Sequence, residues 1–135
     1  MKTLQRKRIL GFTIIELMIV LVIVAILLAI AYPSYVQYAR KAKRGDAQQL
    51  LLNWSINQEI WRSNHTSYAA EGDLAFPTIA HYQFDTGGSD PTATAYTLRA
   101  VAQGDQLKDE ARNGTDCSPL TLDQNGVKSP PACWE

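Results

Sequence analysis

The sequence predicts an α+β protein in which a long N-terminal α-helix packs, through its second half, on a small antiparallel β-sheet of about four strands. Three observations support this fold class. The chain has an apolar run from Phe12 to Tyr32, an amphipathic continuation of the helical pattern to about Ser63, and short strand-like segments separated by turn residues after that. One helix followed by several strands is typical of α+β domains.

The apolar run is long enough to cross a membrane. At about 1.5 Å per residue, a helix from Phe12 to Tyr32 spans about 31 Å, which matches a bilayer's hydrocarbon core. Glu16 is its one charged residue. Basic residues flank the run on both sides, so counting charges does not settle its orientation. Those before it are Lys2, Arg6, Lys7 and Arg8, and those after it are Arg40, Lys41, Lys43 and Arg44.

The helical pattern continues beyond Pro33 as an amphipathic segment. Its apolar residues recur mostly three or four apart, which places them on one face. They are Val36, Ala39, Ala47, Leu50, Leu51, Trp54 and Trp61. We expect the stripe of Leu50, Trp54 and Trp61 to pack on the sheet, and residues 40–44 to form a solvated or headgroup-facing collar. Gly45 interrupts the pattern and is expected to soften the helix.

The strand-like segments lie in the second half of the chain. They are predicted at Tyr82–Phe84, Ala95–Ala102, Leu120–Leu122 and around Val127. Asn125-Gly126 predicts a hairpin turn, because both residues tolerate a positive φ. The sequence gives no strand order and leaves residues 64–94 unassigned.

Charge and cysteine content restrict the function classes. The 13 basic and 13 acidic residues balance, but removal of the first eleven residues would leave nine basic residues against 13 acidic ones. Binding to nucleic acid through phosphate neutralisation usually needs the opposite balance, so composition gives that function no support. The even cysteine count suits one disulfide in an oxidising compartment, although a cytosolic protein could keep Cys117 and Cys133 as separate buried thiols.

The N-terminus allows more than one kind of processing. A secretory signal peptide would use the basic start, the apolar core and the small-residue site Ala29-Ile30-Ala31. A secreted binding domain or enzyme, released after Ala31, is therefore an alternative. An uncleaved signal anchor is another. Glu16 at the start of the core has no use in a signal peptide, and the helical pattern does not stop at Ala31.

The basic leader followed by Gly11, Phe12, Thr13 and Glu16 and then an apolar helix resembles the prepilin signature of type IV pilins. The resemblance implies cleavage by the prepilin peptidase between Gly11 and Phe12, and N-methylation of Phe12. It implies a bacterial inner-membrane precursor with a periplasmic C-terminal domain, later assembled into a surface pilus. The implied partners are other pilin subunits, the peptidase and methyltransferase, and the pilus assembly platform.

Glu16 has a specific role under this resemblance. An unpaired carboxylate at membrane depth costs about 2.5–3.5 kcal/mol, so a partner is expected. Cleavage after Gly11 would create one, the amine of Phe12, four residues away on the same helical face, so the pair could form within one chain or equally between two subunits. The resemblance implies that Glu16 pairs with the amine of a neighbouring subunit during assembly, and we assign Thr13 to the same site.

The resemblance also divides the chain. We expect a leader (1–11), a transmembrane and assembly helix (12–33), an amphipathic helix (34–63) and a β-rich periplasmic or surface domain (64–135). Pro33 stands where many pilins kink the helix, whereas Asn53 stands where many major pilins have a second proline. Pilins typically carry a C-terminal disulfide loop, which implies a Cys117–Cys133 bond closing residues 117–133.

Several features favour a minor pilin within the family: the compact domain, the short disulfide loop and the missing second proline. The expected roles are pilus biogenesis, twitching motility or adhesion. The alternatives are a type II secretion pseudopilin, whose domain typically uses calcium in place of a disulfide, and a DNA-uptake pilin, for which nucleic acid would be a partner.

No catalytic, cofactor or metal site is predicted. Asp85-Thr86-Gly87 matches the aspartic-protease triplet but lies in a polar loop without the flanking strands. The segment 123–126 begins like a calcium loop but lacks the Glu at its twelfth position. His65 and His81 have no further ligands at metal-binding spacing.

Overall fold

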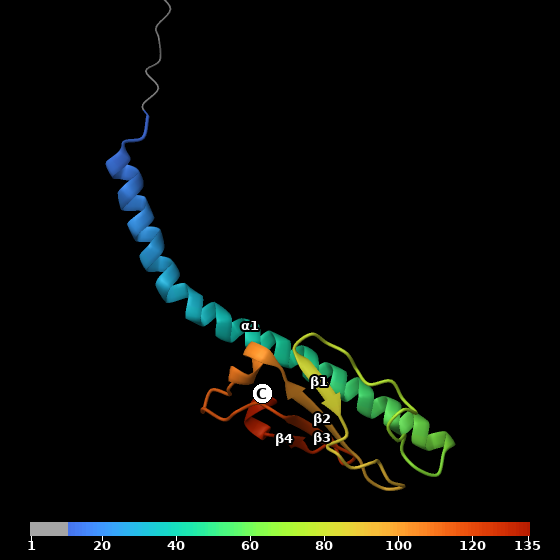
Figure 1. The fold of residues 1–135 in the computed structure, drawn as a ribbon. Coiled ribbons are helices and arrows are strands. Elements are labelled where there is room, and N and C mark those ends of the chain that lie inside the picture. Colours follow the sequence, from blue (N-terminus) through green and yellow to red (C-terminus); the bar gives the residue numbers. More distant parts are fainter. Residues whose placement is uncertain (1–10) are drawn as a thin grey trace, which may run out of the picture. The chain divides into compact units, whose positions relative to one another are not determined.

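The computed structural model describes residues 11–135, which form two compact units, one ending at Val36 and the other running from Gln37 to Glu135. The elements, in chain order, are α1 (Ile14–Asn64), β1 (Tyr82–Asp85), β2 (Thr97–Ala102), the 3-10 helix η1 (Gly104–Lys108), β3 (Leu120–Asp123), β4 (Lys128–Ser129) and the 3-10 helix η2 (Pro131–Cys133) (Figure 1).

Helix α1 begins with a local capping interaction. Thr13 Oγ1 accepts a hydrogen bond from the backbone N–H of Glu16 at 3.2 Å, which satisfies one of the free donors of the first turn. The acidic side chain in this turn is favourable beside the positive end of the helix dipole. Pro33 lies inside the helix and has no N–H for the carbonyl of Ala29. The predicted kink at Pro33 stays a prediction.

The first unit carries the apolar half of α1. Its side chains are exposed, and within the described residues α1 is the one helix long and apolar enough to cross a membrane. The exposed residues include Ile14, Leu17, Val20, Ile23, Leu27 and Ile30.

In the second unit, α1 lies across one face of the sheet (Figure 1). Its buried residues recur at three- and four-residue spacing, so they form one stripe facing the strands. They are Arg44, Ala47, Leu51, Trp54 and Gln58. The predicted stripe was wrong in part, because Leu51 is fully buried, Leu50 packs only at the edge of the core, and Trp61 stacks on His65 with centroids 3.9 Å apart.

The sheet is an antiparallel meander with strand order β1-β2-β3-β4. The four predicted strands are confirmed, although β2 begins at Thr97 and β4 begins after Val127. Ala95 is kept out of the ladder by a turn, in which Thr92 Oγ1 accepts a hydrogen bond from the backbone N–H of Ala95 at 3.0 Å.

The predicted turn at Asn125-Gly126 is confirmed, with one correction. Gly126 has φ +75°, whereas no non-glycine residue in the described chain has a positive φ, so Asn125 does not use that region. Instead, Asp123 Oδ1 accepts hydrogen bonds from the backbone N–H groups of Asn125 and Val127, at 2.9 and 2.8 Å. The aspartate side chain therefore organises the turn.

The core lies between α1 and the sheet. Strand residues alternate, so one face of β1, β2 and β3 is buried against the helix. Trp54 lies at its centre and meets Phe76 and Phe84 edge to face, at centroid distances of 5.1 and 6.4 Å. The buried strand residues are Tyr82, Phe84, Leu98, Ala100, Ala102, Leu120 and Leu122.

The segment between α1 and β1, unassigned from sequence, is attached to the helix by Gln58. Gln58 is 1% exposed, and its amide accepts a hydrogen bond from the backbone N–H of Ala69 at 2.8 Å and donates to the carbonyl of Ala69 at 3.2 Å. A helix side chain here replaces the hydrogen bonds that a strand would provide to this loop.

Candidate functional site

The first candidate site is the start of the apolar helix. Gly11, Phe12 and Thr13 precede the first helical turn, and Phe12 is 78% exposed. Glu16 follows in that turn, and within the described residues no ion pair involves its carboxylate. The structure thus places a free carboxylate one turn from the predicted new N-terminus. The predicted leader, 1–11, lies outside the described residues except for Gly11.

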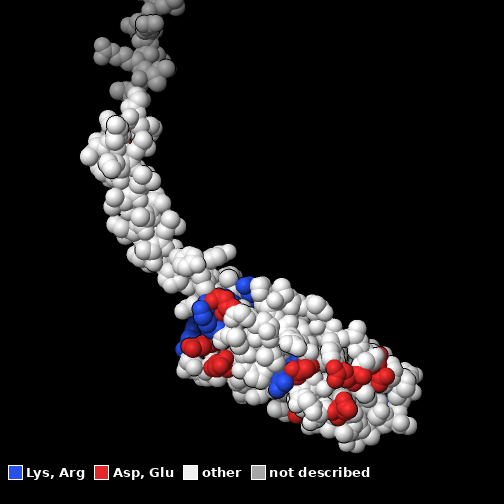
Figure 2. Space-filling view, in the orientation of Figure 1, with Lys and Arg blue, Asp and Glu red and all other residues white. Residues whose placement is uncertain are grey.

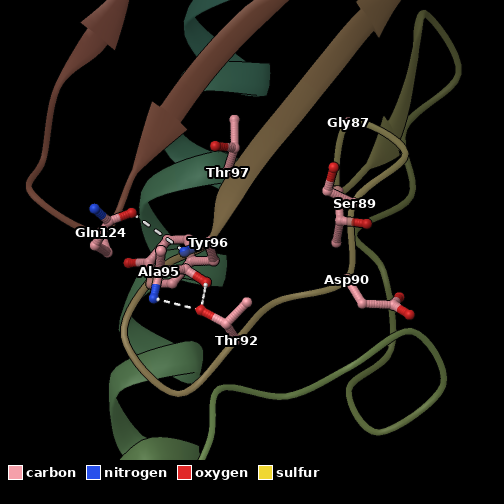
Figure 3. A pocket seen from close by; sticks show the side chains of 9 residues that line it. Gly87, Ser89, Asp90, Thr92, Ala95, Tyr96, Thr97 and Gln124 are labelled. Carbon is pink, nitrogen blue, oxygen red and sulfur yellow. Dashed lines mark hydrogen bonds between the residues drawn. The ribbon is translucent and has the colours of Figure 1, made fainter.

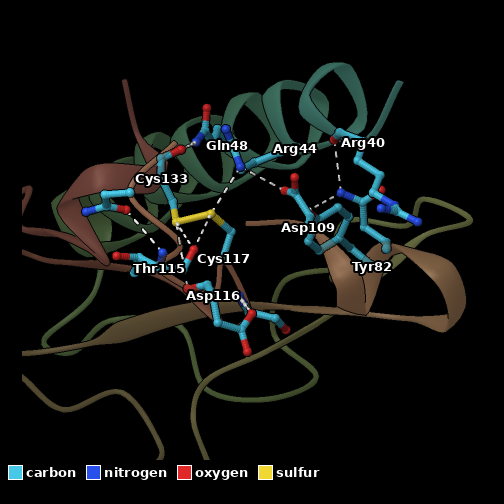
Figure 4. Close-up of polar contacts among 12 residues, drawn as sticks. Arg40, Arg44, Gln48, Tyr82, Asp109, Thr115, Asp116, Cys117 and Cys133 are labelled. Carbon is cyan, nitrogen blue, oxygen red and sulfur yellow. Dashed lines mark hydrogen bonds and ion pairs between the residues drawn. A yellow bond between two sulfur atoms is a disulfide. The ribbon is translucent and has the colours of Figure 1, made fainter. Parts of the chain in front are cut away.

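The second candidate site joins α1 to the C-terminal half of the domain through two arginines. Arg40 makes a bidentate contact with Asp105, in which Nε donates to Oδ2 at 3.1 Å and Nη2 donates to Oδ1 at 2.9 Å. Arg44 Nη1 donates to Asp109 Oδ2 at 2.9 Å (Figure 4). The two arginines are four residues apart, and so are the two aspartates. One face of the helix therefore contacts η1 and the residue after it. We call these four residues the arginine clamp.

The arginine clamp corrects the expectation that residues 40–44 form a solvated collar. Arg44 is 5% exposed and Asp109 is 5% exposed. Only Lys41 and Lys43 stay outside the clamp. Burial raises the pKa of Asp109, and the nearby charge of Arg44 opposes that rise. Hydrogen bonds from Arg40 and Lys108 lower the pKa of the exposed Asp105.

The disulfide is formed between Cys117 and Cys133, with the two Cα atoms 5.6 Å apart. Helix α1 contacts both ends of the loop that the bond closes. Arg44 Nη1 lies 3.0 Å from Cys117 Sγ, and Gln48 Nε2 donates to the carbonyl of Cys133 at 2.6 Å (Figure 4). The loop 117–133 is therefore held by a covalent bond and by two side chains from successive helical turns.

A glutamine completes the buried polar region beside the clamp. Gln106, which is 1% exposed, donates from Nε2 to the carbonyl of Arg40 at 2.9 Å and to the hydroxyl of Tyr82 at 3.1 Å. Burial raises the pKa of Tyr82 to about 12, although the hydrogen bond from Gln106 lowers it. Tyr82 thus stays a neutral phenol, and the region works as structural support.

Sequence analysis missed the arginine clamp, because its members lie 65 residues apart in the chain. A signal was present, however. Arg40, Arg44 and Gln48 recur every four residues on α1, and Asp105 and Asp109 have the same spacing. Matched four-residue periods of opposite charge are compatible with two helical turns lying side by side.

The triplet Asp85-Thr86-Gly87 has a structural role. Asp85 and Arg99 are cross-strand partners, joined by hydrogen bonds of 2.8 and 3.0 Å. The backbone N–H of Gly87 also donates to Asp85 Oδ1 at 2.7 Å. Burial alone would raise the pKa of Asp85, but these hydrogen bonds and the charge of Arg99 bring it below the usual value. The carboxylate is fully engaged, which does not suit a catalytic acid.

A shallow pocket of about 290 Å³ lies between the β1–β2 loop and the β3–β4 turn (Figure 3). Hydroxyl, amide and carboxylate groups line it, and no Lys or Arg is among the lining residues, so it does not suit a phosphate group. The hydroxyl of Thr92 and the side-chain oxygen of Gln124 are already engaged by the backbone N–H groups of Ala95 and Tyr96. The described residues contain no group of three metal-ligating side chains.

Charges are unevenly distributed over the domain. Figure 2 shows the Lys and Arg side chains of one face gathered mainly at the end where α1 enters the domain, whereas acidic side chains dominate the other end. Four of the basic residues of the domain are ion-paired, namely Arg40, Arg44, Arg99 and Lys108. This face therefore has no broad basic surface.

These features define a class of protein: a small disulfide-stabilised α+β domain carried by an apolar helix with a carboxylate in its first turn. Residues 33–121 match the family model "Type IV minor pilin ComP, DNA uptake sequence receptor", and residues 6–32 match the "Prokaryotic N-terminal methylation motif". Together the two matches extend over most of the sequence. The chain belongs to the type IV pilin family.

Individual relatives agree with this assignment. The chain is 30% identical over 116 residues to the "Type IV major pilin protein PilE" of Neisseria gonorrhoeae, covering 79% of this chain and 67% of the relative. It is 40% identical over 116 residues to the "Fimbrial protein" of Neisseria meningitidis serogroup A, covering 79% and 66%. The chain thus spans about two thirds of the length of these relatives.

A solved structure confirms the fold. The type IV pilin from Shewanella oneidensis superposes with a TM-score of 0.50 at 26% sequence identity, covering 71% of this chain and 98% of that chain. The helix, the four-stranded sheet and the C-terminal disulfide are therefore those of a type IV pilin.

Proposed function

We propose that this chain is a minor subunit of a type IV pilus, anchored in the inner membrane before assembly and incorporated through its N-terminal helix. One observation carries the proposal: the apolar half of α1 is uncovered and has a carboxylate in its first turn, while the rest of the chain forms a disulfide-stabilised domain. The work of such a chain is structural, and no catalytic role is assigned to it.

The division of the chain into segments defines the proposed order of processing and membrane anchoring. The leader, 1–11, is removed by the prepilin peptidase between Gly11 and Phe12, and the new Phe12 is methylated. Residues 12–33 then hold the chain as a single-pass protein, with residues 34–135 in the periplasm. The assembly platform and other pilin subunits are its partners.

Glu16 drives the transfer from lipid to filament in this proposal. A carboxylate is disfavoured in hydrocarbon, whereas the amine of Phe12 on a neighbouring subunit would neutralise it. Thr13 supports the site, since its hydroxyl caps the turn that holds Glu16. A kink at Pro33 would let the helix change direction as it leaves the membrane.

The experiment that tests assembly compares Glu16→Ala with the wild-type chain in a piliated host. We expect equal amounts in the inner membrane and a loss of the variant from sheared pili. Glu71→Ala is the matched control, because it removes an exposed acidic residue from the domain. Incorporation of Glu16→Ala at the wild-type level would contradict the role of the carboxylate.

The minor role is supported by the match to a minor-pilin family model. Its test is stoichiometry, because a minor subunit should be scarce relative to the main subunit in sheared pili. Recovery with a type II secretion complex, and absence from pili, would favour the pseudopilin alternative. A chain that forms most of the filament mass would be a major pilin.

A DNA-uptake pilin is the second candidate, because the matching family model is described as a DNA uptake sequence receptor. Charge does not support strong binding to the phosphate backbone, since acidic residues outnumber basic ones after residue 11. Binding of the detergent-solubilised mature chain to duplex DNA, measured between about 50 and 200 mM salt, tests this candidate. Sequence-selective binding that persists at the higher salt would establish it, and no binding at the lower salt would exclude it.

A further inference from the structure

The pocket between the β1–β2 loop and the β3–β4 turn is lined by polar side chains that have no partner in the fold. Thr86 is 6% exposed, yet within residues 11–135 no hydrogen bond involves its hydroxyl. Four other lining groups are in the same condition: the side chains of Ser89, Asp90 and Thr97, and the amide nitrogen of Gln124. Because a hydroxyl as buried as that of Thr86 is normally paired, this set indicates that the pocket receives a polar ligand.

The two walls of the pocket are held in place by local hydrogen bonds. Figure 3 shows residues 89–90 on one side of the open space, and Tyr96 and Gln124 on the other. On the first side, Asp85 Oδ1 accepts a hydrogen bond from the backbone N–H of Gly87 at 2.7 Å. On the second, Gln124 Oε1 accepts one from the backbone N–H of Tyr96 at 3.2 Å. The unpaired groups are therefore already positioned, which lowers the entropy cost of binding a ligand.

Charge restricts the kind of ligand. Asp90 is the one charged side chain that lines the pocket, and no ion pair among the described residues involves it. The pocket also lies at the end of the domain away from the point where α1 enters (Figure 1). A carboxylate without a neighbouring cation disfavours phosphates, sulfates and nucleic acids. One carboxylate is also too few for a metal ion, because oxygen-ligated cations need several such ligands. The ligand is therefore an uncharged polar molecule.

The unpaired groups match the hydroxyl groups of a sugar. The hydroxyls of Thr86, Ser89 and Thr97 can each donate and accept, the amide nitrogen of Gln124 donates, and the carboxylate of Asp90 accepts. A neutral sugar ring presents adjacent hydroxyls that also donate and accept, so it can pair with all of these groups at once. The volume of about 290 Å³ is near the lower end of ligand pockets, about 300 Å³. It suits a monosaccharide or the end of a short glycan.

We propose that this pocket binds a neutral sugar. Asp90 accepts hydrogen bonds from two sugar hydroxyls or one, Gln124 donates from its amide nitrogen, and Thr97 pairs with a further hydroxyl from strand β2. This binding is a property of the domain and goes beyond the proposed function, because it does not require a filament. On a pilus, the pocket would let the subunit attach to a surface that carries neutral glycans.

An NMR titration of the mature chain tests the pocket. The chain is kept in a detergent without a sugar headgroup, and the probes are the methyl glycosides of glucose, galactose, mannose and N-acetylglucosamine. Each is added up to about 50 mM, which would nearly saturate a site with a dissociation constant of about 1 mM. At least one probe should shift the backbone amides of residues 86–97 and of Gln124 in a saturable way. If no probe shifts them, or if the shifts lie elsewhere in the domain, the inference is wrong.

Two variants assign the binding to the unpaired side chains. Asp90→Ala should weaken the affinity about tenfold, because hydrogen bonds to a charged group are lost. Thr97→Val keeps the shape of an exposed strand residue and removes its hydroxyl, and it should weaken the affinity about threefold. Asp46→Ala is the matched control, since it removes an exposed carboxylate from α1, outside the pocket. All three should keep the wild-type unfolding midpoint. Wild-type affinity in both pocket variants would contradict the proposal.

A charged form of the ligand tests the electrostatic argument. The 6-phosphate of the sugar that binds best should bind at least about tenfold more weakly than the neutral sugar, because Asp90 repels it and no cation in the pocket lining compensates. Equal or tighter binding of the phosphate would show that the pocket selects anions, and it would overturn the inference. Both titrations use the isolated chain, so their failure leaves the pilus assignment unchanged. Conversely, exclusion of the chain from pili would leave a measured sugar affinity standing.

Discussion

Arg44 donates a hydrogen bond from Nη1 to Asp109 Oδ2 at 2.9 Å, linking helix α1 to the segment that follows η1 across 65 residues of sequence. The two side chains are 6% and 5% exposed. The same nitrogen lies 3.0 Å from Sγ of Cys117. One helix residue therefore contacts both an aspartate and the disulfide that closes the C-terminal loop, which makes the domain dependent on the integrity of this ion pair.

Loss of Arg44 should destabilise the domain strongly. Arg44→Ala would leave the Asp109 carboxylate buried without its partner, so we expect the free energy of unfolding to fall by about 3–5 kcal/mol. Lys41→Ala, one turn earlier and exposed, should change it by less than about 0.5 kcal/mol. Urea unfolding followed by tryptophan fluorescence measures both, because Trp54, Trp61 and Trp134 all lie in the domain.

A double variant distinguishes two quantities: the net contribution of the Arg44–Asp109 ion pair to stability, and the cost of leaving one buried charge without its partner. Arg44→Met combined with Asp109→Leu replaces both charges with apolar groups, and we expect much of the lost stability to return. If the double variant is no more stable than Arg44→Ala, then the lost contacts to the disulfide loop, and not the unpaired carboxylate, account for the loss.

The ion pair also shows a limit of prediction from sequence. Residues 40–44 look like a basic collar after a membrane helix, because local sequence contains no acidic partner for them. Their partners, Asp105 and Asp109, approach only when the chain returns to the helix after β2. The helix and the strands could be predicted, because they depend on local periodicity in the sequence. The contact between Arg44 and Asp109 could not, because it depends on tertiary packing.

The register of α1 predicts losses of stability of very different size for two adjacent leucines. Leu51 is fully buried between helix and sheet, whereas Leu52 is 39% exposed. Leu51→Ala should cost about 2–5 kcal/mol through lost burial and the cavity it leaves. Leu52→Ala should cost much less, since this side chain is already partly in water and its truncation leaves no enclosed cavity. Equal urea midpoints for the two variants would contradict the packing of the helix.

The same register explains why the predicted stripe of Leu50, Trp54 and Trp61 was correct only in part. Trp54 and Trp61 are seven residues apart and fit one helical face, yet only Trp54 reaches the sheet. The burial stripe runs through Arg44 and Gln58, two polar residues that hydrophobic periodicity cannot identify as buried. Their burial is possible because Asp109 and the backbone of Ala69 satisfy their hydrogen bonds.

Removal of the disulfide should weaken the domain by about 3 kcal/mol in the loop-entropy model. The suitable variant is the double change Cys117→Ser and Cys133→Ser, which leaves no free thiol. Its unfolding midpoint in urea should match that of the wild-type chain treated with a reductant. A double variant as stable as the oxidised wild type would mean that Arg44 and Gln48 hold the loop without the covalent bond.

The pair of Asp85 and Arg99 should give a measurable pH dependence. The folded pKa of Asp85 lies below its value in the unfolded chain, about 3.9. The stability that this group contributes is therefore present above about pH 4 and is lost as the pH falls through the folded pKa. Because the pair is partly exposed, its contribution should be at most about 1 kcal/mol.

The comparison for this effect is wild type against Asp85→Asn between about pH 7 and pH 2. The advantage of the wild type should be constant down to about pH 5 and shrink below about pH 4. The difference between the two curves is the informative quantity, because Asp109 has a raised pKa and acts in the opposite direction. A difference that does not change with pH would exclude Asp85 as the titrating group.

The mass of the mature N-terminus tests the central claim most directly. The precursor would be expressed in a piliated host and its mature form analysed by intact mass and N-terminal sequencing. The account predicts a chain that begins with N-methylated Phe12 and retains Glu16. A chain that begins at Tyr32 would show cleavage of a secretory signal peptide after Ala31, and it would contradict the account because the apolar helix and its carboxylate would have been removed.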